Sequence, residues 1–203
     1  MTLHALNFVS IREDVEVIGV HGGVLLVEDC SFRGNRGGAI RVSSGDVSVS
    51  NSRFVDNGEG GRQTRGGAID VSGGRLLVEG SRFEGNRAEH GGAISANGAS
   101  AVIDVSASHF ENNSATELGG AINIEDGAIA TLRDQTRLVL NEAHRSGTSL
   151  HLGGDSGSRA TYLLPAPAGY WVANSVNCSD QPASDVCRGQ PPSAVAVAFL
   201  PGR

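Results

Sequence analysis

A two-part motif occurs four times in this sequence: Phe-x-x-Asn, a polar segment, and then Gly-Gly-Ala-Ile. Successive Gly-Gly-Ala-Ile copies start at residues 37, 66, 91 and 119, so they lie 29, 25 and 28 residues apart. A period of this size is typical of one supersecondary unit that stacks on copies of itself and cannot bury its apolar face alone. The sequence therefore predicts a solenoid.

Each repeat predicts two short strands. Aliphatic and polar residues alternate before each Phe, as in Leu25 to Val27 and Leu76 to Val78, which is the period-2 pattern of a strand with one buried face. The Ile of each Gly-Gly-Ala-Ile opens the second strand. The repeats differ in length mainly between the Asn and the Gly-Gly, where one to eight residues intervene. We therefore expect one variable loop per repeat, longest at residues 58–65.

The repeat contains too few residues for a four-stranded propeller blade and shows no helical pattern. It fits a coil that winds once and pairs with the coil above, so we predict an all-β parallel β-helix of about six coils. Equivalent residues would stack at about 4.8 Å in ladders. The asparagines could alternatively cap separate turns, but their constant spacing from Phe favours a ladder. The predicted ladders are Phe32, Phe54, Phe83 and Phe110, and Asn35, Asn57, Asn86 and Asn113.

The pattern divides the chain into three parts. Residues 1–152 carry the repeats, residues 153–173 form a closing segment with both tyrosines and the only Trp, and residues 174–203 read as a Cys-containing tail or linker. The sequence begins inside a strand, because Leu3 and Phe8 already follow the repeat register. Since the terminal coil of a solenoid has an edge to protect, we expect another domain of a longer chain, or a neighbouring subunit, at the N-terminal end.

The three cysteines fall into two kinds. Cys178 and Cys187 lie nine residues apart in a polar, Pro-containing tail, and we predict a disulfide between them, worth about 2–3 kcal/mol in an oxidising compartment. The alternative is a pair of free surface thiols. Cys30 precedes Phe32 by two residues, at the position that Ser52, Ser81 and Ser108 occupy in later repeats, so we expect a buried and inert thiol.

The recurring Gly-Gly-Ala-Ile and Phe-x-x-Asn motifs resemble those of the chlamydial polymorphic outer-membrane proteins and related surface proteins. The resemblance covers residues 1–152 and implies a right-handed β-helix outside the cell that serves adhesion or surface coating. The Leu-Pro-Ala-Pro-x-Gly-x-Trp segment at 164–171, with a Cys further on, is also similar to the end of β-helix regions in large surface proteins of microbial eukaryotes.

Charge and composition argue against several partners. The net charge is −6 without a basic cluster, so we expect no nucleic-acid binding, and no apolar run approaches the ~20 residues of a membrane span. The six histidines lack the close spacings of a zinc site, and we expect neither a metal nor a cofactor. Asn112 and Asn177 begin Asn-x-Ser sequons and are candidate glycosylation sites in a secretory setting.

Parallel β-helices also carry polysaccharide lyases and hydrolases, so we examined the residues that should point outward after each Gly-Gly. These are Arg41, Asp70, Ser95 and Asn123, followed by Glu125 in the next column. Asp70 and Glu125 should lie two coils apart, farther than the paired carboxylates of a hydrolase. Arg41 and Asp70 are most simply a cross-strand ion pair.

We therefore expect a non-catalytic structural or adhesive module, extracellular or at the cell surface, for which surface glycans are candidate ligands. The alternative is a carbohydrate-active enzyme or a carbohydrate-binding module. A cluster of three or more carboxylates on one face would favour an enzyme, whereas mixed polar columns would favour a scaffold.

Overall fold

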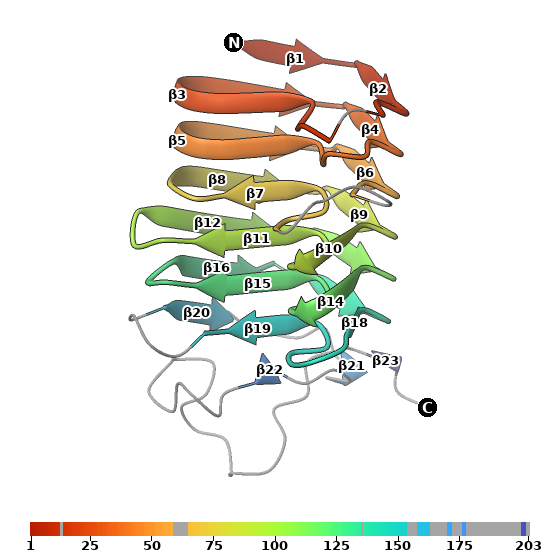
Figure 1. Cartoon of the computed structure of the whole chain (residues 1–203), viewed down its shortest axis with the longest axis vertical. Coiled ribbons are helices and arrows are strands. Elements are labelled where there is room, and N and C mark those ends of the chain that lie inside the picture. Colours follow the sequence, from red (N-terminus) through yellow and green to blue (C-terminus); the bar gives the residue numbers. More distant parts are fainter. Residues whose placement is uncertain are drawn as a thin grey trace.

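The computed structural model describes residues 1–12, 14–58, 65–134, 136–153 and 158, and the backbone of four further strands between residues 159 and 201. The described residues form a stack of β-coils, with the N-terminus at one end (Figure 1). The stack confirms the predicted all-β parallel β-helix. The described part contains no helix long and apolar enough to cross a membrane.

The largest sheet has twelve strands and wraps two sides of most coils. It contains β1 (Thr2–His4), β3 (Ile18–Glu28), β5 (Ile40–Ser50), β7 (Ile69–Val71), β8 (Gly74–Glu79), β11 (Ile94–Asn97), β12 (Ala101–Ser106), β15 (Ile122–Glu125), β16 (Ile129–Arg133), β19 (Leu150–Leu152), β20 (Arg159–Tyr162) and β22 (Val176–Asn177). Both predicted strands of a coil belong to this one sheet, which folds back at glycines in the left-handed region, such as Gly45 (φ 91°) and Gly74 (φ 82°).

The Phe-x-x-Asn motifs form a second, six-stranded parallel sheet with one strand per coil. Its strands are β2 (Asn7–Val9), β4 (Ser31–Arg33), β6 (Arg53–Val55), β9 (Arg82–Glu84), β13 (His109–Glu111) and β17 (Arg137–Val139). Separately, β21 (Tyr170–Trp171) pairs antiparallel with β23 (Leu200–Pro201).

The sequence predicts a loop between the Asn and the Gly-Gly of each repeat. The structure shows that this segment is a loop only in some coils. In later coils it forms a third parallel sheet of β10 (Arg87–His90), β14 (Ser114–Leu118) and β18 (Glu142–Ala143). Ala88 pairs with Ala115, and Ala115 with Ala143, so a column of small side chains lies inside this sheet. Ala88 and Ala115 are buried, which gives the segment an apolar face of its own.

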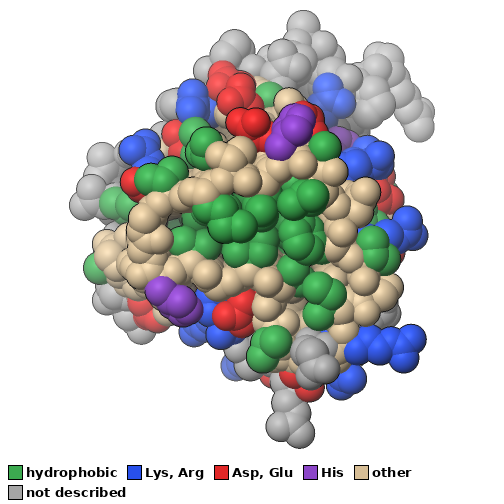
Figure 2. Space-filling model, turned by 90° about the horizontal axis from the view of Figure 1, so that it is seen from above, with side chains coloured by type: hydrophobic (Ala, Val, Ile, Leu, Met, Phe, Trp, Pro, Cys, Tyr) green, Lys and Arg blue, Asp and Glu red, His purple; other side chains and the backbone are tan. Residues whose placement is uncertain are grey.

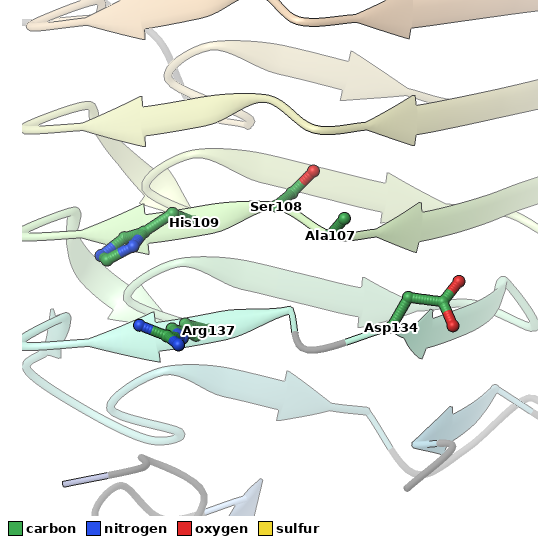
Figure 3. Close-up of a pocket in the computed structure, with 5 residues that line it drawn as sticks. All are labelled: Ala107, Ser108, His109, Asp134 and Arg137. Carbon is green, nitrogen blue, oxygen red and sulfur yellow. The ribbon is translucent and has the colours of Figure 1, made fainter. Parts of the chain in front are cut away.

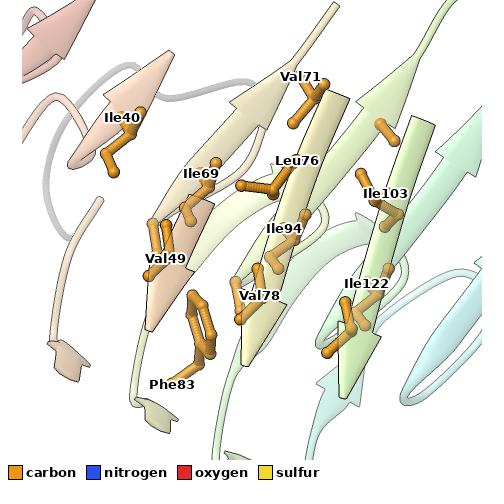
Figure 4. Packing of buried hydrophobic residues seen from close by; sticks show 14 of the residues in the cluster. Ile40, Val49, Ile69, Val71, Leu76, Val78, Phe83, Ile94, Ile103 and Ile122 are labelled. Atoms are coloured by element: carbon orange, nitrogen blue, oxygen red, sulfur yellow. The ribbon is translucent and has the colours of Figure 1, made fainter. Parts of the chain in front are cut away.

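Apolar side chains from successive coils stack on one another to form a single core (Figure 4). The Phe rings lie nearly parallel, with centroids 4.7 Å apart for Phe8 and Phe32, 4.9 Å for Phe32 and Phe54, 4.7 Å for Phe54 and Phe83, and 4.6 Å for Phe83 and Phe110. Leu138 pairs with Phe110 and is also buried, so a leucine continues the Phe column into the last repeat.

The asparagines form a continuous hydrogen-bonded ladder. The side-chain amide of Asn57 donates to Oδ1 of Asn86 at 2.9 Å, and that of Asn86 donates to Oδ1 of Asn113 at 2.9 Å. The same amides reach back to backbone carbonyls of the preceding coil, as from Asn86 to the Phe54 oxygen at 2.9 Å. Asn35 and Asn141 take equivalent places at the two ends. Each buried amide is thereby satisfied within the stack.

In the second, third and fourth copies of Gly-Gly, close packing of coils requires the second glycine. A Cβ at Gly92 would lie 2.2 Å from the Gly120 carbonyl oxygen and 2.6 Å from the Ser114 backbone nitrogen. Gly67 and Gly120 are similarly confined by backbone atoms of the following coil. This contact explains why the glycine recurs where the third sheet meets the large one.

Candidate functional site

The residues predicted to point outward from the Gly-Gly-Ala-Ile strands form one column along the stack. Arg41 pairs with Asp70, Asp70 with Ser95, Ser95 with Asn123 and Asn123 with His151. We call these five residues the lateral strip. The strip is not an exposed surface, however, because only Arg41 is substantially accessible. Asp70 is 7% exposed, and Ser95 and Asn123 are fully buried.

Residues that pair just before the Gly-Gly turns flank this column. Arg65 forms a bridge with His90, and Leu118 with Ser146. Nη1 of Arg65 lies 3.4 Å from Oε2 of Glu125, and the side-chain amide of Asn123 donates to the same Glu125 oxygen at 2.9 Å. The third sheet and the turns that follow it therefore place a second set of polar side chains beside the strip.

Each carboxylate near the strip lies beside an arginine. Nε of Arg41 is 3.3 Å from Oδ2 of Asp70, and Nη1 of Arg41 is 3.6 Å from Oε2 of Glu16. Arg65 adds a second positive charge close to Asp70. The result is an alternation of positive and negative groups along the stack rather than an acidic cleft.

Two acceptors in the strip are buried without a hydrogen-bond donor among the described residues. These atoms are Oδ1 of Asp70 and Oδ1 of Asn123, which lie two coils apart on either side of Ser95. Buried acceptors of this kind are normally satisfied by ordered water or by a ligand group. The strip therefore offers two acceptor positions for a small polar donor.

Burial raises the pKa of Asp70 above its ordinary value of 3.8, and the nearby Arg41 and Arg65 only partly oppose this effect. As the pH rises past that ordinary value, the unfolded chain loses this proton before the native protein does. Asp70 should therefore make the native state progressively less stable as pH rises, until its native pKa is passed. The Asp70→Asn variant should lack this decline.

The measurement is the free energy of urea unfolding of both proteins from about pH 3 to about pH 7. We expect the difference between wild type and Asp70→Asn to shift in favour of the variant as the pH rises. A difference that stays constant, or that shifts in favour of wild type, would contradict the environment described for Asp70.

A separate cavity of about 270 Å³ lies at the corner between the large sheet and the Phe sheet (Figure 3). Its lining residues are Ala107, Ser108, His109, Asp134 and Arg137. Burial lowers the pKa of His109; the charge of Glu111 opposes this effect in part, and the charges of Arg82 and Arg137 support it. The surroundings of His109 therefore favour the neutral imidazole.

The hydroxyl of Ser108, the serine in this cavity, forms two hydrogen bonds that stabilise the fold. Ser108 Oγ donates to the Ser106 carbonyl at 2.7 Å and accepts from the Ser81 backbone N–H at 3.1 Å. Ser81 and Ser52 make the same pair of contacts one and two coils earlier, so Ser108 belongs to a serine ladder. It is thus not poised as a nucleophile for His109.

The structure describes one of the three cysteines and one complete glycosylation sequon. Cys30 is buried at the end of the serine column and has a free thiol that lies 3.2 Å from the Glu28 carbonyl oxygen. Asn112 is exposed in the left-handed region (φ 55°), so its side chain is accessible for a glycan. Cys178 and Cys187 lie outside the described residues, and Asn177 is described only as backbone, so their predictions stand untested. No group of three or more His, Cys, Asp or Glu in the described chain is arranged to hold a metal ion.

A comparison with protein-family models matches residues 2–158 to a family described as the right-handed beta helix region. The chain belongs to the right-handed β-helix family. The match covers all of the repeats and supports the handedness that the sequence resemblance implied, but it does not single out the polymorphic outer-membrane type. Searches of curated proteins and of solved structures found no match.

For this β-helix chain, sequence reasoning identified four residues of the lateral strip and the neighbouring Glu125, but it did not identify Arg65 and Glu16 as their partners. Arg65 falls in the longest variable segment, and Glu16 precedes the first long strand, where no repeat position marks it. One feature of the sequence could have identified Arg65 as part of this site. Arg65, His90 and Leu118 all stand directly before a Gly-Gly pair, so they hold equivalent positions in their repeats. Residues at that position come together because the third sheet keeps the coils in register.

Proposed function

We propose that this β-helix chain is a non-catalytic structural or adhesive module that acts outside the cell or at the cell surface. We further propose that it belongs to a larger protein or assembly, whose neighbouring domain or subunit meets its N-terminal end. The observation that carries the proposal is the pairing of charges around the lateral strip. Asp70 and Glu16 share Arg41, and Glu125 lies against Arg65.

Glycoside hydrolysis needs two carboxyl groups that face one substrate bond, about 5–9.5 Å apart, with one protonated as the acid. Here Asp70, the one carboxylate of the strip, lies beside Arg41, and Glu125 next to the strip lies beside Arg65. Several other outward charges form comparable pairs, such as Arg133 with Asp104 at 2.9 Å and Arg145 with Glu117 at 2.7 Å. Such pairs match the mixed polar columns of a scaffold.

One observation favours the second candidate, a carbohydrate-active enzyme or carbohydrate-binding module. Asp70 is a buried carboxyl with a raised pKa and an unpaired Oδ1, beside Arg41 and Arg65 on the lateral sheet. Perturbed carboxyl groups of this kind cluster at functional sites, although ion-pair networks inside a fold perturb them as well. Asp70 is therefore the residue through which the two functions can be separated.

The test is an assay of the purified chain against neutral and acidic polysaccharides. It measures new reducing ends for hydrolysis and unsaturated uronate absorbance for elimination, and it measures co-sedimentation with insoluble glycans for binding. We expect no turnover by wild type or by Asp70→Asn. Turnover by wild type that Asp70→Asn abolishes would overturn the proposal and assign an enzyme. Glycan binding without turnover would exclude the enzyme and leave an adhesive or carbohydrate-binding role.

A further inference from the structure

The outer face of the six-stranded Phe sheet carries a column of basic side chains. Each strand of this sheet has three residues, and its middle residue, a Phe or Leu138, packs toward the core. The residues on either side of it therefore turn outward. The outward residue before the middle one is basic in four successive coils. These residues pair in register from coil to coil, and we call them the basic column: Arg53, Arg82, His109 and Arg137.

The column does not appear as a basic cluster in the sequence, because its members stand 29, 27 and 28 residues apart. The chain contains no lysine, so every cation of this kind is a guanidinium. Seen from the N-terminal end, arginine side chains (blue) project on the right, the side on which the Phe sheet lies (Figure 2). The outward positions of the sheet hold four arginines and two glutamates, whereas the whole chain has a net charge of −6.

Part of this positive charge is unpaired. Arg82 is compensated, since its Nε lies 3.0 Å from Oε2 of Glu84 and its Nη2 lies 2.7 Å from Oε2 of Glu111. Arg53, and Arg33 on the adjacent strand β4, are exposed and form no ion pair with a described residue. Like charges on neighbouring strands destabilise a sheet. An anion bound between these arginines would relieve that repulsion.

The spacing of the column indicates what kind of anion fits. Neighbouring strands lie about 4.8 Å apart, so the basic side chains repeat at that distance along the stack. An extended acidic peptide presents side chains on one face only every 6.6–6.8 Å or so, and it falls out of step. A polyuronate carries one carboxylate on each sugar ring, and a pyranose ring spans a distance similar to the strand spacing. Guanidinium groups also match carboxylates through paired hydrogen bonds.

The glutamates beside the column favour a ligand that also donates hydrogen bonds. Glu84 and Glu111 pair with each other on the far side of the buried rings. They would repel a densely charged polymer such as duplex DNA, which carries one charge per about 1.7 Å. The hydroxyl groups of a sugar can instead donate to them. The cavity lined by His109 and Arg137 (Figure 3), about 270 Å³ in volume, adds a hollow at this end of the column.

We propose that the basic column binds a linear polyuronate, an acidic polysaccharide with a carboxylate on every ring, which lies along the stack across the Phe sheet. Its carboxylates contact the arginines, and its hydroxyl groups reach Glu84 and Glu111. The proposal rests on the adhesive role proposed above and names a ligand class and a site for it. The site lies on a different sheet from Asp70, which belongs to β7 of the large sheet.

The experiment is calorimetric titration of the whole chain with alginate, a polyuronate, in calcium-free buffer at low salt. We expect binding that weakens as added salt screens the charges. Arg53→Gln should weaken it about tenfold, as expected for the loss of one charge-assisted contact. A double variant with Arg33→Gln as well should weaken it further. The matched control is Arg75→Gln on β8 of the large sheet, an exposed arginine without an ion pair, which should bind as wild type does.

Three further polymers test the ligand class. Hyaluronan has a carboxylate on every second ring only, so it should bind more weakly than alginate. Polyglutamate and single-stranded DNA should also bind more weakly, because their charges are out of step with the column. In nuclear magnetic resonance spectra the ring signals of His109, assigned from their loss in His109→Gln, should shift when alginate binds.

Three results would overturn the proposal. The first is a wild type that does not bind alginate, and the second is an Arg53→Gln variant that binds as tightly as Arg75→Gln. The third is equal affinity for alginate, polyglutamate and DNA, which would mean a general patch for polyanions. The turnover assay with Asp70→Asn is independent of these titrations, and a structural role would stand without alginate binding. The proposed function is therefore judged separately.

Discussion

Replacing Phe83 by alanine is expected to lower the free energy of unfolding by about 3–5 kcal/mol. The ring is fully buried between Phe54 and Phe110, with centroid distances of 4.7 and 4.6 Å. The substitution removes two stacking contacts as well as apolar burial, and it leaves a cavity in the middle of a continuous column. Chemical denaturation of both proteins under the same conditions measures the difference.

Phe8→Ala is the internal comparison for this prediction. Phe8 stacks on one side only and is partly exposed, so its loss should cost clearly less than that of Phe83. A loss below about 1 kcal/mol for Phe83→Ala would show that the Phe column does not hold the coils together, since a buried phenylalanine ordinarily contributes several times more.

Replacing Asn86 by alanine should cost about 3 kcal/mol or more, because it leaves several buried groups unpaired at about 1–3 kcal/mol each. Oδ1 of Asn86 accepts from the backbone N–H of Asn57 at 3.1 Å and from its side-chain amide at 2.9 Å. Nδ2 of Asn86 donates to the Phe54 carbonyl and to Oδ1 of Asn113, both at 2.9 Å. No shift of neighbouring groups can replace all four bonds.

The control for the ladder is Asn112→Gly. Asn112 adjoins the ladder residue Asn113 but is exposed, and glycine accepts its positive φ of 55° without strain. We expect a small change for this variant and a large one for Asn86→Ala in the same unfolding experiment. Equal losses would mean that the asparagines act as separate turn residues, which is the alternative that the sequence left open.

The stacking of coils was predictable because its determinants recur at fixed spacing. Phe and Asn always stand three residues apart, and the Ile of each repeat opens a strand at the same point of the coil. In a solenoid each residue meets its own counterpart one coil away, so a period in the sequence translates directly into a contact in space. The parallel fold follows from that period without knowledge of any long-range pairing.

The burial of the lateral strip was not predictable in this way. Asp70 and Asn123 face solvent only if no neighbouring segment covers them. The neighbouring segment is the one between Asn and Gly-Gly, whose length changes from coil to coil. Each strand of the third sheet contributes only one small buried residue, such as Ala88 or Ala115, to the apolar face of that sheet. Such a weak apolar signal does not distinguish a strand from a loop in one sequence.

The direction of the coils has a mechanical consequence. Neighbouring coils are held together by hydrogen bonds that run along the stack between paired strands, and the N-terminal end and the last described coil lie at opposite ends of it (Figure 1). A pulling force applied at the two ends of the stack would load the hydrogen bonds of the outermost coils first and peel one coil before the next. Each release would free a segment of 25 to 29 residues, or roughly 85–100 Å of extended chain. A tether built this way lengthens in repeated steps and dissipates work at each one, while the coils that are still closed keep their shape.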